Sequence, residues 1–246
     1  MLNPIVVIPA RMASKRLPGK PLADIHGTPM VVHVLRQAEA AALGPVVVAC
    51  AESAVAEAVV QAGGRAVLTA PDLPSGSDRV RAALAEVDPE RRHDAVVNLQ
   101  CDRPEIPPEA IRAALEPLSN PEVDIGTIAY EITAPAERED ADVVKAVIAL
   151  APGARVGRAL YFSRLPAPGG AGAMYHHEGI YAFRREALER FVALAPGALE
   201  QRENLEQLRA LEAGMRIEVA LVDSLPRGVD TPADLERARA RIARKS

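Results

Sequence analysis

A cluster of four cations is the first group of residues that could do chemistry. Arg11, Lys15, Arg16 and Lys20 lie within ten residues that contain no Asp or Glu, although the whole chain has 29 Lys and Arg against 33 Asp and Glu. Arginine forks, lysine ammonium groups and the main-chain N–H groups that glycine exposes together suit a triphosphate. The P-loop pattern is absent. A solvated basic loop is the alternative, but the position directly after a predicted strand favours phosphate binding by this cationic loop (residues 9–22).

Two aspartates are candidates for holding a metal ion beside such a phosphate. Asp102 directly follows a predicted strand at residues 95–99. A carboxylate there suits Mg²⁺, which is usually held by one or two carboxylates together with substrate phosphates. Asp230 precedes a predicted helix at residues 232–244, where Asp-Thr-Pro is also typical of a helix N-cap. The residues alone favour the capping role for Asp230 over the metal role.

A serine-rich turn is the third candidate. Ser75, Gly76 and Ser77 follow a predicted strand and open a helix. Small hydroxyl side chains and a glycine at a helix N-terminus leave N–H groups available, which suits polar contacts to a base or a ribose. Capping of the helix by Ser75 or Ser77 is compatible with that role.

Alternating strand-like and helix-like runs in the first half of the chain position these candidates. Apolar, β-branched strands are predicted at residues 5–8, 46–50, 65–69 and 95–99. Helices are predicted to begin with Thr28 as N-cap and Pro29 as first helical residue, at Ser53 as a cap, after the serine-rich turn, and at residues 107–108. This succession predicts an α/β fold with a doubly wound, mainly parallel sheet. Ligands bind beyond the carboxyl ends of such strands, where all three candidates lie.

The second half of the chain is less regular. Strands are predicted at residues 123–132, 143–150, 159–162, 180–183 and 217–222, and helices at 185–194, 199–213 and 232–244, with a Pro- and Gly-rich loop at 165–173. The chain shows no internal repeat and no long polar linker. We therefore expect a single domain over residues 1–246 with a smaller inserted sub-region.

Composition excludes several classes of protein. The 246 residues are 49% hydrophobic and 25% charged, which is ordinary for a globular chain, and the net charge of −4 argues against nucleic-acid binding. No apolar stretch approaches the ~20 residues of a membrane span, and no signal-peptide pattern is present. The two cysteines are far apart and indicate neither a disulfide framework nor a zinc site. We expect a soluble cytoplasmic protein.

Seven blocks of the sequence resemble the 3-deoxy-D-manno-octulosonate (Kdo) cytidylyltransferases. The stretch PARMASKRLPGKPLADIHGTPM resembles their N-terminal signature, which other sugar-nucleotide transferases share. The later blocks follow in collinear order along almost the whole chain, and HEGIY, LEQLR and GVDTP narrow the resemblance. These blocks are SGSDR (75–79), NLQCD (98–102), ALYFSR (159–164), HEGIY (177–181), LEQLR (205–209) and GVDTP (228–232).

The resemblance implies a nucleotidyltransferase that couples CTP to Kdo for lipopolysaccharide assembly. The anomeric hydroxyl of the sugar attacks the α-phosphate in line, and CMP-Kdo and diphosphate result. A nucleotide-diphospho-sugar transferase-like fold and a homodimer are also implied, and we expect the dimer interface in the irregular sub-region at about residues 134–179. Asp102 and Asp230 become the Mg²⁺ ligands, which reverses the preference for a cap at Asp230.

The implied site residues fall into three sets. The catalytic set is Arg11, Arg16, Lys20 and Asp102. The set expected to bind CTP is Pro9, Ala10, Arg11, Met12, Ser14, Arg16, Lys20, Ser75, Gly76, Ser77, Arg79 and Gln100. The set expected to bind the sugar is Gln100, Arg164, His177, Tyr181, Glu203 and Gln207.

The sugar-binding set combines the resemblance with spacing. His177 and Tyr181 are four residues apart, which places them on one face of a strand, and Glu203 and Gln207 are four apart on a predicted helix. Kdo is an acid, and Arg164 is the candidate for its carboxylate. Without the resemblance, structural aromatic residues and a solvated helix face would be the preferred interpretations.

Two residues beside Asp102 depart from the family pattern. The family usually has Gly where this chain has Cys101, and many relatives have an acidic or apolar residue where it has Arg103. An arginine there either adds phosphate contacts or competes with the metal for Asp102. The alternative functions are cytidylyl transfer to another ulosonic acid, such as 8-amino-Kdo or a sialic acid, and nucleotide binding with little turnover.

Overall fold

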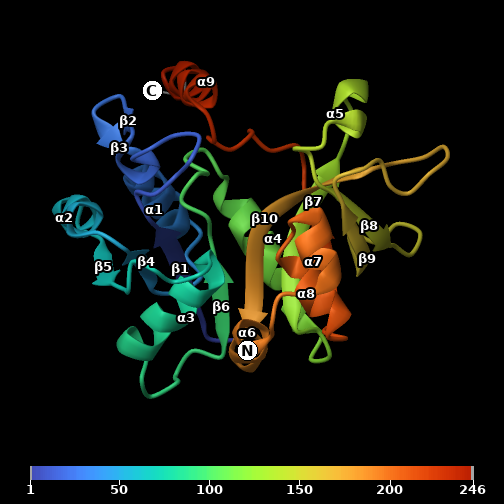
Figure 1. Ribbon diagram of the computed structural model, residues 1–246, viewed down its shortest axis with the longest axis horizontal. Coiled ribbons are helices and arrows are strands. Elements are labelled where there is room, and N and C mark those ends of the chain that lie inside the picture. The colour runs from blue at the N-terminus through green and yellow to red at the C-terminus, as the bar shows by residue number, and fades with distance from the viewer. Residues whose placement is uncertain (1, 245–246) are drawn as a thin grey trace. The chain divides into compact units, whose positions relative to one another are not determined.

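The protein chain groups into two compact units in a computed structural model that describes residues 2–244 (Figure 1). The first unit contains the described residues up to Ile111 and those from Pro226 onward, and the second unit spans Arg112–Leu225. Two compact units can form one domain, so the expected single domain stays a prediction. None of the helices in residues 2–244 is long and apolar enough to cross a membrane.

Four parallel strands form the core of the first unit. They lie in the order β5 (Arg65–Leu68), β4 (Val46–Cys50), β1 (Pro4–Ala10) and β6 (Ala95–Asn98). All residues of β1 and β6 are buried, as expected for strands covered on both faces. The register aligns the ends of β1 and β4, because Ala10 pairs with Cys50, whereas β6 ends at Asn98 opposite Val7, three residues before the end of β1. The predicted α/β fold with a mainly parallel sheet is confirmed for this unit.

Helices connect these strands, and two of the predicted helix starts are wrong. The connecting helices are α1 (Met30–Ala40), α2 (Ser53–Gln61) and α3 (Gly76–Val87), with a short 3₁₀ turn η1 (Lys20–Leu22). Helix α4 (Pro108–Leu115) begins in the first unit and ends in the second, and α9 (Pro232–Ile242) is the last element of the chain. Ser75 caps α3 through a hydrogen bond from Asp78 N, as predicted. Ser53 is not the cap of α2, because the N-cap position is Glu52.

The expected cap at Thr28 is wrong because Thr28 belongs to a hairpin. Strand β2 (Asp24–Ile25) pairs antiparallel with β3 (Thr28–Pro29), and the two residues between them, His26 and Gly27, both have positive φ. Two consecutive positive φ values are typical of the tight turn that matches the twist of a hairpin. The backbone of Thr28 is therefore held in a ladder, and α1 begins at Met30.

Five strands of the second unit pair in a closed ring. They are β7 (Ile125–Glu131), β8 (Lys145–Ala149), β9 (Val156–Ser163), β10 (Tyr175–Arg184) and β11 (Ile217–Leu221). Their pairing order is β10-β7-β11-β9-β8, and β8 also pairs with β10. The helices are α5 (Pro135–Glu139), α6 (Arg185–Ala193), α7 (Ala198–Glu203) and α8 (Gln207–Glu212), with a 3₁₀ turn η2 (Glu116–Ser119).

The single helix expected at residues 199–213 is two helices. Asn204 adopts a left-handed conformation with a φ of 54° and ends α7. Asparagine is one of the few residues that tolerate this conformation. The bidentate ion pair between Arg209 of α8 and Glu200 of α7 then joins the two pieces. The break places the carboxylate of Glu203 at the end of a helix instead of on a continuous helix face.

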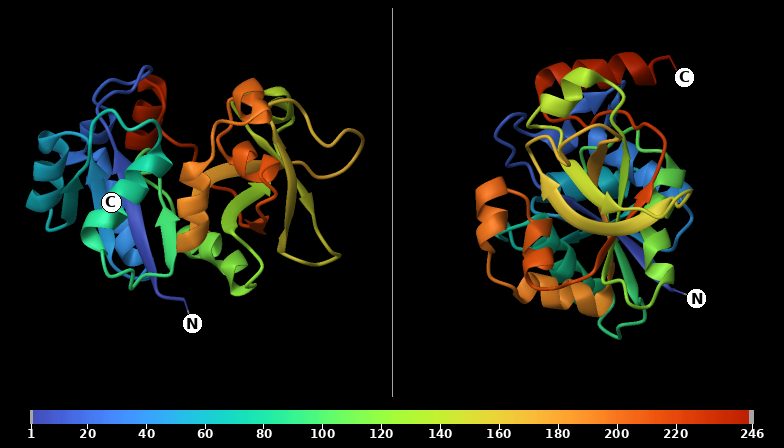
Figure 2. Two further views of the ribbon diagram at one scale, coloured as in Figure 1. Left: turned by 60° about the horizontal axis from the view of Figure 1, so that its bottom comes forward. Right: turned by 90° about the vertical axis from the view of Figure 1, so that its right-hand side faces the viewer.

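The terminal helix α9 packs on the N-terminal part of the first unit, beside the β2–β3 hairpin (Figures 1 and 2). Leu235 and Ala238 of α9 share an apolar cluster with Ile25 and Met30. Arg241 also forms an ion pair with Glu105, in which its Nε and Nη2 both lie 2.6 Å from Glu105 Oε2, and the side chain of Glu105 is only 4% exposed.

Replacement of Arg241 by Ala is expected to loosen α9. The change leaves the carboxylate of Glu105 buried without its arginine, which should lower the free energy of unfolding by about 2 kcal/mol, discounted from the value for a fully buried pair because Arg241 is partly exposed. Urea unfolding measures the change. Arg244→Ala is the matched control, since Arg244 is exposed just beyond α9 and should leave the midpoint unchanged. Equal midpoints for both variants would contradict this role.

Candidate active site

A cavity of about 650 Å³ opens at the carboxyl ends of β1 and β6, and its described lining comes from the first unit alone. Its volume is typical of a small-molecule site. The residues expected to bind CTP line it, except Met12 and Ser77. The carbonyl group of Met12 accepts two main-chain hydrogen bonds within the loop, and Ser77 is buried in the first turn of α3. Ala13, Lys15 and Cys101, which were not in the expected set, line it as well.

The cationic loop turns around one carbonyl group. The main-chain N–H groups of Ser14 and Gly19 both donate to Met12 O, at 2.9 and 3.1 Å. Gly19 has a φ of 72°, a value that glycine adopts without strain, and the chain enters η1 directly after it. This turn leaves Arg11, Lys15 and Arg16 exposed and directs Lys20 inward, where its side chain is only 12% exposed.

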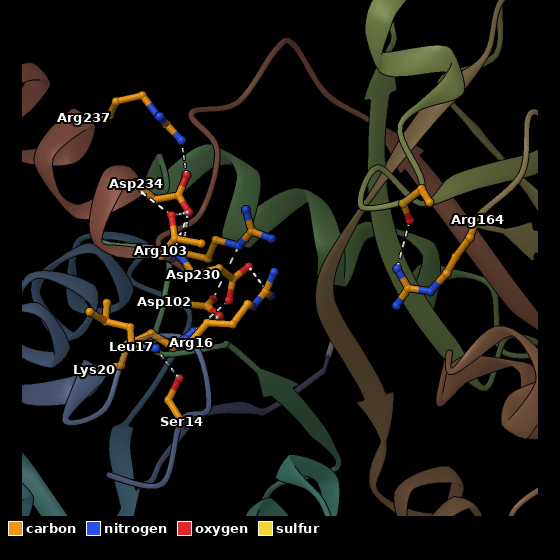
Figure 3. A network of polar contacts seen from close by, with 12 residues as sticks. Ser14, Arg16, Leu17, Lys20, Asp102, Arg103, Arg164, Asp230, Asp234 and Arg237 are labelled. Carbon is orange, nitrogen blue, oxygen red and sulfur yellow. Dashed lines mark hydrogen bonds and ion pairs between the residues drawn. The ribbon is translucent and has the colours of Figure 1, made fainter.

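Lys20 joins the two predicted metal ligands (Figure 3). Its Nζ lies 3.0 Å from Asp102 Oδ2 and 3.0 Å from Asp230 Oδ1. The other carboxylate oxygens also face cations: Arg16 Nη2 lies 3.2 Å from Asp230 Oδ2, and Arg103 Nε lies 3.6 Å from Asp102 Oδ1. Three cations thus surround two carboxylates, and the excess positive charge suits a triphosphate.

The ion pairs keep this group of residues charged. Burial lowers the pKa of Lys20, but Asp102 and Asp230 outweigh burial and raise that pKa above its ordinary value. Burial raises the pKa of Asp102, but Lys20 and Arg103 outweigh it and lower that pKa. Both groups therefore carry charge at neutral pH. Burial raises the pKa of Cys101 to about 12, so its thiol stays protonated and is a poor nucleophile.

The two aspartates fit a divalent cation. Both accept from a single Lys20 nitrogen, so the two bonded oxygens face one point and are at most twice 3.0 Å apart. Two oxygens on one Mg²⁺ are at most about 4.2 Å apart, so the carboxylates would draw together around the ion once Lys20 has left. An oxygen-only donor set with two carboxylates suits Mg²⁺, which completes its shell with water and substrate phosphates. Within residues 2–244 no group of three or more His, Cys, Asp or Glu side chains could hold a metal. A bound nucleotide would therefore have to supply part of the metal shell.

The cap of α9 frees Asp230 for this role. Thr231 is the N-cap of the helix, and its hydroxyl accepts from Asp234 N at 3.2 Å. Asp234 in turn accepts from the main-chain N–H groups of Thr231 and Asp230. The capping role that the residues alone favoured for Asp230 is wrong, because Thr231 fills it.

This cap is expected to give the protein a pH-dependent part of its stability. Burial raises the pKa of Asp234, but hydrogen bonds from Thr231, Arg237 and the main chain lower it to about 2. Because that pKa is lower in the folded chain than the ordinary 3.8, the ionised form stabilises the fold above pH 3.8, and this stability is lost as the pH falls toward 2. Asp234→Asn should unfold about 2 kcal/mol more easily at pH 6, with the difference vanishing near pH 2. Urea unfolding across this range measures the difference, and a constant difference would contradict the assignment.

The expected base-binding side of the cavity is formed at α3 and after β6. A Cβ at Gly76 would lie 3.5 Å from Pro9 and 3.7 Å from Gln100, so the glycine keeps this wall open. Gln100 Nε2 donates to Asn98 Oδ1 at 2.9 Å. The guanidinium of Arg79, which is 2% exposed, donates to the carbonyl groups of Ala70 and Pro71. Arg79 thus fixes the loop at the end of β5 as well as lining the cavity.

Five of the six expected sugar-binding residues lie in the second unit, and Gln100 lies in the first. Glu203 Oε2 accepts from Arg164 N at 3.1 Å, and Glu203 Oε1 accepts from the hydroxyl of Tyr161. Tyr161 was not in the expected set. Its alternation with Phe162 in the ALYFSR block was the signal that it faces the side of β9 opposite to that buried residue.

Arg164 is engaged by the main chain. Its guanidinium donates to the carbonyl groups of Glu203, Ala141 and Asn204. Lys145, which is fully buried, donates to the carbonyl groups of Arg164 and Asp140. These neutral partners join the segments around Asp140, Arg164 and Glu203. A role of Arg164 toward a sugar carboxylate stays a prediction.

His177 and Tyr181 come together despite an irregular strand. A bulge between Glu178 and Tyr181 gives β10 two residues more than β7, and the extra pair preserves the alternation of faces. The two rings lie 5.6 Å apart, and His177 Nε2 lies 3.0 Å from Thr127 Oγ1. Gln207 is 5% exposed at the start of α8.

Comparison with known proteins decides the family. Residues 5–217 match the model of the cytidylyltransferase family. The chain is 66% identical over 238 residues to the 3-deoxy-manno-octulosonate cytidylyltransferase of Rhodospirillum centenum, covering 97% of this chain and 93% of that one. The chain belongs to the 3-deoxy-manno-octulosonate cytidylyltransferase family. The family and the enzyme class predicted from the sequence are confirmed.

A second relative and two solved structures are also similar to this chain. The enzyme of Parvibaculum lavamentivorans is 63% identical over 244 residues, covering 99% of this chain and 94% of its own. A solved CMP:2-keto-3-deoxy-manno-octonic acid synthetase complexed with CTP is 38% identical, with a TM-score of 0.91 over 99% of both chains. A nucleotidyl transferase from Methanothermobacter is 15% identical with a TM-score of 0.60, covers 99% of both chains and shares the fold alone.

Proposed function

We propose that this protein transfers the cytidylyl group of CTP to the anomeric hydroxyl of Kdo and releases diphosphate, which activates the sugar for lipopolysaccharide assembly. The observation that carries the proposal is the convergence of Asp102 and Asp230 on Lys20 at the wall of a cavity that the cationic loop also lines. The family of the chain and the CTP complex of a structural relative support it.

The cations of the loop act on the phosphates. Arg11, Arg16 and Lys20 bind the triphosphate and neutralise the charge that develops on the departing diphosphate. The side chain of Arg16 is exposed and that of Lys20 is largely buried, so the two can bind different phosphate groups of the triphosphate. Phosphoryl transfer of this kind depends on positioning and charge neutralisation more than on covalent help from the protein.

Asp102 and Asp230 would hold a divalent cation, which we take to be Mg²⁺. When bound there, the ion supplies Lewis-acid neutralisation of the α-phosphate and lowers the pKa of the attacking hydroxyl. Lys20, which the phosphates attract, would leave the two carboxylates as the ion arrives. Recognition of the acidic sugar is assigned to Gln100 and to residues of the second unit: Arg164, His177, Tyr181, Glu203 and Gln207.

The decisive experiment is diphosphate release with CTP, Mg²⁺ and Kdo. We expect turnover with Kdo and little with 8-amino-Kdo or a sialic acid. If one of those acids were turned over faster than Kdo, that acid would be the substrate in place of Kdo. Measurable CTP binding by calorimetry without diphosphate release from any ulosonic acid would show a nucleotide-binding paralogue instead.

We also infer a homodimer formed through residues 134–179 and a place of action in the cytoplasm, without a nucleic-acid partner. Leu160 and Leu165 in and beside β9 are 55% and 70% exposed, and large exposed apolar side chains favour an interface. Light scattering should give twice the chain mass of 26.1 kDa.

A further inference from the structure

Three cations contact Asp102 and Asp230 in the part of the chain that the structure describes, and the proposed function gives no role to one of them, Arg103. Its Nε lies 3.6 Å from Asp102 Oδ1, on the oxygen that Lys20 does not bind. It is not among the described residues that line the cavity, and its side chain is 21% exposed. Arg16 and Lys20 line the cavity, where an incoming triphosphate would attract both of them.

The guanidinium of Arg103 packs against the main chain at Gly228. A Cβ built on Gly228 would lie 2.7 Å from Arg103 Nη1 and 2.8 Å from Cζ, so a side chain at this position would displace the guanidinium. The next residue, Val229, donates its N–H to Asp102 O at 2.9 Å. Arg103 and Asp102 thus both contact the strip of main chain before Asp230. The side chain of Arg103 is 21% exposed and that of Arg16 is 56% exposed, so Arg103 has less freedom to move.

We propose that Arg103 is a positioning residue that keeps one oxygen of Asp102 engaged and thereby prevents a divalent cation from occupying Asp102 and Asp230 before the nucleotide has bound. Without nucleotide, three cations face two carboxylates, and their net positive charge repels a metal ion. With nucleotide, Lys20 and Arg16 move to the phosphates, while the confined Arg103 stays. The carboxylates then carry a net negative charge, and Asp102 offers the ion a single oxygen. The inference rests on the proposed function for the identity of the nucleotide.

Binding of Mn²⁺, followed by the electron paramagnetic resonance signal of the free ion, tests this order without any turnover. The parent protein should bind Mn²⁺ weakly alone, and with CTP it should remove more free Mn²⁺ than the same concentration of CTP does without protein. Arg103→Gln should bind Mn²⁺ without CTP at least about tenfold more tightly, because one repelling charge is removed beside the ligands. Arg92→Gln is the matched control: Arg92 is an exposed arginine at the amino end of β6, paired with Glu90, and its loss should change nothing.

Gly228→Ala provides a second route that keeps the charge. The new methyl group would push the guanidinium away from Asp102, so Mn²⁺ affinity without CTP should rise in the same direction but by less. The double variant should match Arg103→Gln, because the added methyl group acts only through Arg103. If Arg103→Gln does not fold, Gly228→Ala decides alone.

Unchanged Mn²⁺ affinity in both variants, or tight binding by the parent without CTP, would overturn the proposal. The diphosphate assay separates this result from the proposed function. Arg103→Gln could bind Mn²⁺ without CTP more tightly than the parent while no ulosonic acid supports turnover. That result would reject the proposed function and keep the role of Arg103.

Discussion

Asp102→Asn should lower kcat for diphosphate release by about a thousandfold, or roughly 4 kcal/mol of transition-state stabilisation. The amide cannot offer the anionic oxygen that a divalent cation needs, and it removes one of the two carboxylates on Lys20. CTP binding, measured by calorimetry in the absence of metal, should stay the same or tighten slightly, because a negative charge facing the phosphates has gone. The loss therefore falls on kcat and not on nucleotide affinity.

The control for this change is Asp223→Asn. Asp223 is fully exposed and its ion pair with Arg155 lies in solvent, so its amide variant should keep the parent kcat. If Asp102→Asn retained turnover within about tenfold of the parent at saturating Mg²⁺, the assignment of Asp102 as a metal ligand would be wrong.

Lys20→Met should have the second-largest effect and a different signature. The substitution removes a charge-assisted contact to the phosphates, worth about 2 kcal/mol, so the Kd of CTP should rise about thirtyfold, and kcat should fall as well. It also leaves Asp102 and Asp230 facing each other without the ammonium group between them. Mg²⁺ without nucleotide should therefore raise the melting temperature of the variant more than that of the parent.

Calorimetry with CTP and thermal melts with and without Mg²⁺ measure the two effects. Arg36→Met serves as the control, since Arg36 is an exposed cation on α1. A variant that lost CTP affinity but gained no thermal response to Mg²⁺ would show that Lys20 binds phosphate without separating the two carboxylates.

The core of the first unit was predictable because its signals are local. Runs such as Val46–Cys50 are apolar at every position, which a strand buried on both faces requires. The cap at Ser75 follows from its own hydroxyl and the next turn of α3. Once these strands are placed, the general position of ligands at their carboxyl ends puts the cationic loop and Asp102 on one edge.

The elements that were missed depend on positive φ values at residues other than glycine. His26 at 53° makes the hairpin that removes Thr28 from the helix, and Asn204 at 54° divides α7 from α8. The helix signals in the same segments are genuine: Thr28-Pro29 has the form of a helix start, and residues 199–213 carry a helical apolar stripe. A turn that overrides such signals is stabilised by contacts made elsewhere, as the Arg209–Glu200 ion pair shows.

The pairing of the two aspartates could not be predicted from spacing. Lys20 and Asp230 are 210 residues apart in the sequence, and only the resemblance placed them in one site. The cap at Thr231 has a sequence signature, but it fixes only the start of α9. What brings Asp230 to the site also includes the ion pair between Arg241 and Glu105, which has no sequence signature. The sugar-binding residues of the second unit remain predictions as well, and the guanidinium of Arg164 donates to main-chain carbonyl groups that no sequence pattern reveals.

The return of α9 to the first unit also sets the order in which the proposed site is completed while the chain is synthesised. Asp230 emerges from the ribosome only after the whole second unit has been translated. A nascent chain that has already folded β1, β4, β5 and β6 carries the cationic loop and one carboxylate, but not the other. Such a chain would have the loop that we propose binds the triphosphate, but only one of the two proposed metal ligands, so on this proposal it would bind nucleotide without turning it over.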